Sequence, residues 1–87
     1  MVTPYEAYYI KEVCIPDERS TIKYYAKEMG DFKKLLEGKM AKNNDDIRQW
    51  YKYFLTYAEI ELEAANARLE KYREELNTFT MQERELS

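Results

Sequence analysis

Apolar residues recur every three or four positions from Ile47 to Leu76, and this segment contains neither glycine nor proline. The mean step of about 3.6 residues is the period of a straight α-helix. The pattern predicts a long helix over residues 45–77, about 50 Å in length at 1.5 Å per residue. Either Asn44 or Asp45 is expected to cap its first turn.

A second helical pattern covers residues 17–40, where apolar side chains are again three or four positions apart. Gly30 lies inside this pattern at a cost of about 1 kcal/mol relative to alanine, which indicates a close helix contact or a local bend. The short connection 41–44 predicts an antiparallel hairpin with the long helix. The apolar stripe ends at Met40, and the expected hairpin core is Ile22, Tyr25, Met29, Phe32, Leu36, Ile47, Tyr51, Phe54, Leu62 and Leu69.

Residues 4–14 are expected to form a short helix that starts with a capping box made by Thr3 and Glu6. Pro16 disfavours the helical conformation in the residue before it, so this helix is predicted to end ahead of the proline. A β-strand over residues 8–15 is the alternative, because this stretch is rich in aromatic and β-branched residues.

Residues 78–87 are expected either to fray as a tail or to restart as a short helix after a break at Asn77-Thr78, with Thr80 as its cap. The fold class predicted for residues 1–87 is a single all-α domain. It consists of a short N-terminal helix followed by a helical hairpin with a long C-terminal helix.

The long helix carries two apolar stripes. The first seam is Ile47, Tyr51, Phe54, Ala58, Leu62, Ala65, Leu69, Tyr72 and Leu76, and the second seam is Trp50, Tyr53, Tyr57, Ile60, Ala64 and Ala67. At about 100° per residue, their centres lie roughly 125° apart around the helix axis. Residues 17–40 cover one seam, and the other needs a second neighbour.

Residues 4–14 are too few to cover a helix about 50 Å long. We therefore expect a homodimer or larger homo-oligomer, assembled as a helical bundle or coiled coil. The alternative is a three-helix monomer in which residues 4–14 double back over the second seam.

Glu61 and Arg68 lie symmetrically about the midpoint of Ala64 and Ala65. In an antiparallel two-fold crossing centred there, each Glu61 would face Arg68 of the other copy. The alternative is that both are solvated charges at the rim. The candidate protein interface is Trp50, Tyr53, Tyr57, Ile60, Glu61, Ala64, Ala67 and Arg68.

The composition restricts the chemistry that the chain supports. It has one cysteine, Cys14, and no histidine, which excludes an intrachain disulfide and the usual structural zinc sites. Because histidine is the most frequent catalytic acid or base, we expect no enzyme activity and no cofactor. Glu59, Glu61 and Glu63 lack the Glu-x-x-His spacing of helix-bundle metal sites, which indicates a solvated acidic strip.

The first residues lack the basic start and the apolar stretch expected of an export signal, the sequence has no long apolar run, and its formal net charge is −3. These features predict a cytoplasmic protein without a membrane segment and with no general attraction to nucleic acid. We expect a protein-binding module, either a self-assembling adaptor or structural subunit or a regulatory inhibitor of a larger host protein, of the kind that phages and mobile elements encode. The alternative is a nucleotide or single-stranded nucleic-acid site at Arg48–Phe54 with Lys23-Tyr24-Tyr25, where cations alternate with aromatic rings.

Overall fold

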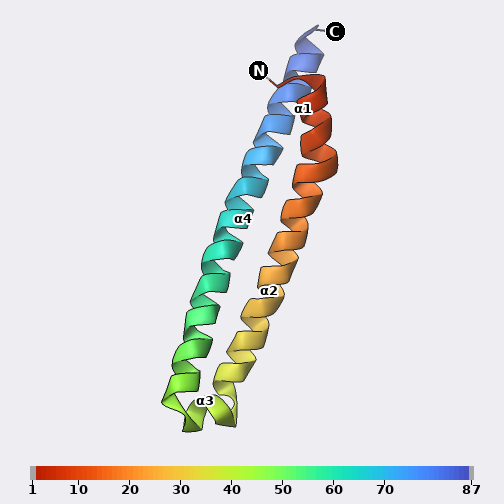
Figure 1. Cartoon of the computed structure of the whole chain (residues 1–87). Coiled ribbons are helices and arrows are strands. Elements are labelled where there is room, and N and C mark those ends of the chain that lie inside the picture. Colours follow the sequence, from red (N-terminus) through yellow and green to blue (C-terminus); the bar gives the residue numbers. More distant parts are fainter. Residues whose placement is uncertain (1, 87) are drawn as a thin grey trace.

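The computed structural model describes residues 2–86, and within this range the chain is helical and contains no β-strand. The predicted all-α class and the long C-terminal helix are therefore confirmed, and the strand considered for residues 8–15 is wrong. The elements, shown in Figure 1, are α1 (Pro4–Tyr9), a π-helical turn η1 (Ile10–Cys14), α2 (Ile15–Glu37), α3 (Lys39–Asn43) and α4 (Asp45–Leu86).

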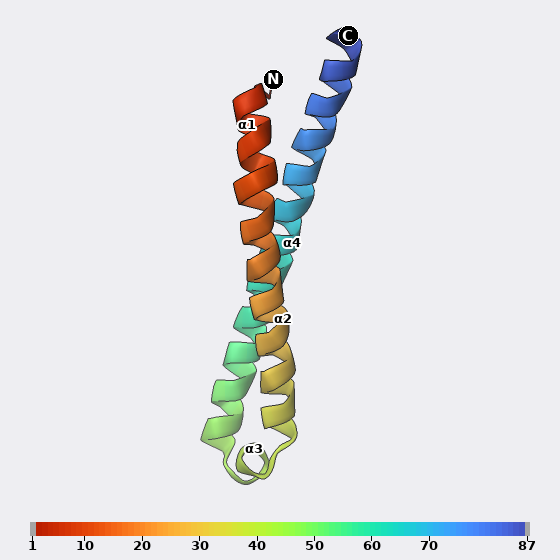
Figure 2. The same ribbon diagram turned by 90° about the vertical axis from the view of Figure 1, so that its right-hand side faces the viewer.

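The molecule is a rod with extents of 66 × 15 × 14 Å. Its radius of gyration is 19.0 Å, whereas a compact chain of this length has a value of about 12 Å. One continuous helical run formed by α1, η1 and α2 lies beside α4 and runs in the opposite direction, and the short α3 makes the turn between them (Figure 1). In the view of Figure 2, α2 and α4 cross near the middle of the rod.

The first seam of α4 packs against α2, and small side chains occupy its closest contacts. Ala58 and Ala65 are 2% and 0% exposed, so the two helices approach closely at these positions. The larger side chains expected in the hairpin core are half-buried, except Leu69, which is buried, and Phe54, which is exposed along one edge of the interface. A rod of two helices has no interior wide enough to enclose such residues fully.

Helix α2 ends at Glu37, earlier than the predicted limit at residue 40. Gly38 adopts an extended conformation, with φ −78° and ψ 167°, and its amide donates to the Leu35 carbonyl. Met40 therefore belongs to α3, where it is exposed rather than aligned with the apolar stripe of α2.

The predicted helix end before Pro16 is also wrong. Pro16 has no amide hydrogen and its ring crowds the carbonyl four residues earlier, which normally breaks or kinks a helix. Here the backbone widens into η1, in which the Ile15 amide donates to the Ile10 carbonyl five residues back. This wider turn accommodates the proline and lets the helical run continue with Ile15 in the helical region, at φ −66° and ψ −47°.

Helix α4 continues beyond residue 77, so the predicted break at Asn77-Thr78 does not occur. The hydroxyls of Thr78 and Thr80 donate to the carbonyls four residues earlier, Glu74 and Leu76, at 3.0 Å each. These bonds satisfy the hydroxyls inside the helix, so neither threonine acts as a cap. Ser87, the last residue of the predicted tail, lies outside the described residues.

Two predicted caps are confirmed. Thr3 and Glu6 form the expected capping box at the start of α1. Asn44, rather than Asp45, caps α4, because its side-chain oxygen accepts from the amides of Asp46 and Ile47 at 3.0 and 3.2 Å. No helix within residues 2–86 combines the length and the apolar character that crossing a bilayer requires.

Candidate functional site

Aromatic rings from both long helices gather on one side of the rod, on the half nearer α3. We call this surface the aromatic face. Phe32 stacks on Phe54 with ring centroids 5.5 Å apart, and Phe54 stacks on Trp50 at 5.9 Å. Tyr53 makes edge contacts with Trp50 and Phe54, and Tyr25 makes edge contacts with Tyr24 and Tyr57 in a second group. Rings of both groups line one hollow between the helices. The members of the aromatic face are Tyr24, Tyr25 and Phe32 from α2 and Trp50, Tyr53, Phe54 and Tyr57 from α4.

Much of the aromatic face is open to solvent. The exposed fractions are 60% for Trp50, 63% for Tyr53 and 59% for Tyr24, and the neighbouring Ile60 is 59% exposed. Helix α2 covers the first seam of α4. The second seam faces solvent because it lies on a different side of α4. The second seam thus contributes Trp50, Tyr53 and Tyr57 to the face, together with Ile60 at its border.

The N-terminal helical segment does not cover this surface. Ile10 and Ile15 cluster with Leu69, and Tyr72 and Leu76 pack against them, near the opposite end of the rod. The considered three-helix monomer, in which residues 4–14 double back over the second seam, is therefore wrong. The reason is that η1 keeps these residues in line with α2, so they extend the rod and do not fold across it.

Two hollows shape the aromatic face. One, of about 280 Å³, lies between the helices and is lined by Tyr24, Tyr25, Glu28, Phe32, Phe54, Tyr57 and Ala58. The other is a shallow depression of about 540 Å³ beside the indole, lined by Asp46, Gln49, Trp50 and Tyr53. Each hollow combines aromatic walls with one carboxylate, and neither is lined by lysine or arginine.

The cations that alternate with the aromatics in the sequence lie elsewhere on the helices. Arg48 and Lys52 are four residues apart and share one stripe of α4, whereas Trp50 is two residues from each and lies about 160° around the axis. Arg48 is also ion-paired with Asp45. Neither Arg48 nor Lys52 lines a hollow of the aromatic face, and the nucleic-acid alternative stays a prediction.

A polar contact links the helices farther along the rod. Arg68 donates from Nε to Glu18 Oε1 at 2.6 Å. The Glu18 side chain is 13% exposed, and its Oε2 is buried without a hydrogen-bond partner in the described part of the chain. The hydrogen bond to Glu18 raises the pKa of Arg68 above its usual value.

This contact bears on the expected pairing between two copies, because Arg68 is already engaged within its own chain. Glu61 lies close enough to Arg68 and Tyr25 to act on the pKa of both. Ala64 is half-buried and Ala67 is exposed, and both continue the second seam beyond the aromatic face. The predicted interface residues thus divide into an aromatic group on this face and a small or charged group farther along α4.

Two residues were not placed at these sites from the sequence: Tyr24 was named only in the nucleic-acid alternative, and Glu18 was assigned to no contact. Tyr24 contributes an exposed ring from α2, and its signal was its place one residue before Tyr25 of the apolar stripe. Glu18 lies four residues before Ile22 and therefore on the apolar side of α2. A carboxylate at such a position indicates a buried side chain that needs a hydrogen-bond partner.

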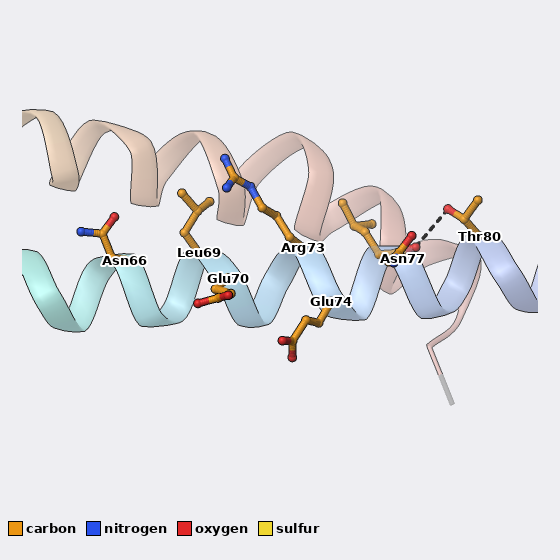
Figure 3. Close-up of a pocket in the computed structure, with 8 residues that line it drawn as sticks. Asn66, Leu69, Glu70, Arg73, Glu74, Asn77 and Thr80 are labelled. Carbon is orange, nitrogen blue, oxygen red and sulfur yellow. Dashed lines mark hydrogen bonds between the residues drawn. The ribbon is translucent and has the colours of Figure 1, made fainter.

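A further hollow is an open groove of about 780 Å³ along the C-terminal half of α4. Figure 3 shows Leu69 and Arg73 directed toward the neighbouring helix and Glu70 and Glu74 directed away from it. Its remaining lining residues are Asn66, Leu76, Asn77 and Thr80, so charges of both signs are mixed and no ring is present.

The described residues contain no group of three or more Cys, Asp or Glu side chains arranged to hold a metal ion. Comparison of the chain with protein-family models, with curated proteins and with solved structures gives no match.

Proposed function

We propose that this chain is a non-catalytic protein-binding module and that the aromatic face is its docking surface. The observation that carries the proposal is two groups of aromatic rings that line one hollow between the helices, with Tyr24, Trp50 and Tyr53 each about 60% exposed. Tryptophan and tyrosine are enriched among the residues that dominate binding energy at protein interfaces.

The size of the exposed cluster supports the same function. Each aromatic side chain contributes about 150–250 Å² when covered, so the exposed parts of the face amount to roughly 600 Å². The largest apolar patch on an ordinary monomer is about 300–600 Å², and each partner in a standard interface contributes about 800 Å². The face is therefore at the upper limit for a monomer and supplies most of one side of an interface.

Such a module acts either as an adaptor or structural subunit or as an inhibitor that covers part of a larger protein.

Dimerisation is the second candidate, and Ala64 and Ala67 favour it because small side chains allow a second α4 to approach closely. In that assembly, pairing of Glu61 with Arg68 of the other copy competes with the Glu18 contact. Sedimentation tests it: we expect Glu61→Arg to weaken the dimer. Adding Arg68→Glu should restore it in a Glu18→Gln background, where no buried carboxylate opposes the new charge.

Paired capture experiments test the docking surface. Wild-type chain and the variant Tyr53→Ala with Tyr57→Ala are immobilised and exposed to the same extract from the native host. The matched control is Lys52→Ala with Thr56→Ala, one position earlier on the outer side of α4. We expect the aromatic variant to lose a stoichiometric partner that the control retains, with equal helicity in all three proteins. Retention by the aromatic variant would contradict the proposed surface.

A further inference from the structure

We infer that the partner which docks on the aromatic face presents a basic amphipathic helix. This inference rests on the proposed function and adds the chemistry of the partner. Lysine or arginine side chains of that helix would lie over the rings and beside the carboxylates at the edge of the face.

The charged residues that line the two hollows of the aromatic face are both acidic. Glu28 lines the hollow between the helices, and Asp46 lines the depression beside Trp50. Neither carboxylate forms an ion pair with another side chain in residues 2–85. Glu61 adds a third negative charge next to Tyr25. A partner without cations would remove water from these carboxylates and supply no opposite charge, which is unfavourable. We therefore expect the partner to carry lysine or arginine where it covers the face.

The rings favour the same partner. The face of an indole or phenol ring is electrostatically negative and attracts a lysine or arginine cation placed over it. Trp50 and Tyr53 are exposed directly beside Asp46, so ring and carboxylate attract the same side chain.

The shape of the face fits a helix. Two antiparallel helices present a groove along their length, and a third helix can lie in it through apolar residues spaced at i, i+3, i+4 and i+7. The hollow of about 280 Å³ between Tyr24 and Tyr57 is the place for a large apolar anchor of that helix.

A second copy of this chain is a poorer match for the face. A two-fold axis through the aromatic cluster would bring the acidic edges of the two copies together, since each surface meets its own equivalent. The residues that line the two hollows include no cation to oppose them.

Synthetic peptides test this inference directly, because Trp50 is the single tryptophan of the chain and lies in the face. Three peptides of about 18 residues, or five helical turns, share one leucine stripe and contain no tryptophan. Their polar positions are all lysine, all glutamine or all glutamate. We expect the lysine peptide to shift Trp50 emission with an affinity at least about tenfold higher than the glutamate peptide, and added salt to reduce this difference.

Two double variants assign the preference to named carboxylates. Glu28→Gln with Asp46→Asn removes the acidic edge and should reduce the preference for lysine while the glutamine peptide still binds. Glu59→Gln with Glu63→Gln removes the same charge from the outer side of α4 and should leave the preference unchanged. Circular dichroism checks that both proteins keep their helicity.

The outcomes separate the inference from the proposed function. Equal binding of all three peptides, or an unchanged preference in Glu28→Gln with Asp46→Asn, overturns the basic partner and leaves the docking surface standing. If the protein sediments at twice its monomer mass, Trp50 is buried and the peptides do not bind, a second copy occupies the aromatic face. This result also overturns the inference of a basic partner. If no peptide alters Trp50 emission and the aromatic variant captures the same proteins as wild type, both proposals fail.

Discussion

Arg68 of α4 binds Glu18 of α2 across 2.6 Å, although fifty residues separate them in the chain. The contact joins the two long helices directly at their interface. Sliding one helix past the other by a single turn, about 5.4 Å, would separate the two groups. Because the Glu18 carboxylate is largely buried, such a slip would leave a charge without its partner. The pair therefore helps to set the register of the rod.

We expect Arg68→Ala to lower the thermal midpoint, because it leaves the Glu18 carboxylate buried and uncompensated. Adding Glu18→Gln to this variant should recover part of the loss, since the remaining side chain is neutral. Circular dichroism melts of the single and double variants measure the coupling. Lys71→Ala, at an exposed position of α4, is the control. Equal midpoints for Arg68→Ala and Lys71→Ala would show that the pair does not hold the helices together.

Close packing at Ala65 predicts a sharp difference between neighbouring alanines. Ala65 is fully buried against the other helical run, whereas Ala67 is exposed. We expect Ala65→Leu to destabilise the chain by about 1–3 kcal/mol through overpacking, and Ala67→Leu to change stability by less than about 0.5 kcal/mol. Urea unfolding measures both values. A tolerated leucine at residue 65 would mean that the helices can separate there without cost.

Gly30 offers a stabilising substitution. The expected close helix contact is absent at this glycine, since a Cβ atom built there meets nothing within 4 Å. Gly30→Ala should therefore raise the free energy of unfolding by about 0.5–1 kcal/mol, the usual gain of alanine over glycine inside a helix. Gly38→Ala is the contrasting variant, because its Cβ atom would lie 3.3 Å from the Leu35 carbonyl oxygen. We expect no gain there, and the shift of the urea midpoint distinguishes the two.

Two tyrosines make the fold sensitive to alkaline conditions. The hydrogen bond with Tyr57 raises the pKa of Tyr25 above its usual value of 10.0, and burial raises the pKa of Tyr72. Above pH 10 the unfolded chain loses these protons more readily than the folded chain, so stability falls as pH rises.

We therefore expect Tyr25→Phe with Tyr72→Phe to flatten the decline of the urea midpoint as the pH rises above 10. Tyr5→Phe, at a side chain that is 76% exposed, is the control. If the double variant follows the wild-type profile, these two hydroxyls do not cause the alkaline loss.

Local patterns predicted much of the fold because they are set by neighbouring residues. The 3.6-residue spacing located α4, and the side-chain chemistry of Thr3 and Glu6 located the start of α1. Pro16 was misread because the rule for the residue before proline describes an α-helix and takes no account of a π-helical turn. Thr80 was misread because a hydroxyl that bonds within a helix has the same sequence signature as a cap.

The candidate site was predicted in part for a related reason. The second seam follows from spacing alone, so Trp50, Tyr53 and Tyr57 could be placed on one side of α4. Their neighbours Tyr24 and Phe32 come from the other helix, and the register that brings them together depends on contacts between distant residues. The sequence pattern contains no direct measure of that register.

The rod places the aromatic face far from α1 and from the last turns of α4. The aromatic face lies on the half of the rod nearer α3, whereas α1 and the last turns of α4 lie toward the other end (Figures 1 and 2). Leu86 is about 44 Å from Tyr57 along α4, at 1.5 Å per residue. A fluorescent protein or a surface tether joined to either end would therefore leave the partner free to bind, and the helices between them would act as a rigid spacer.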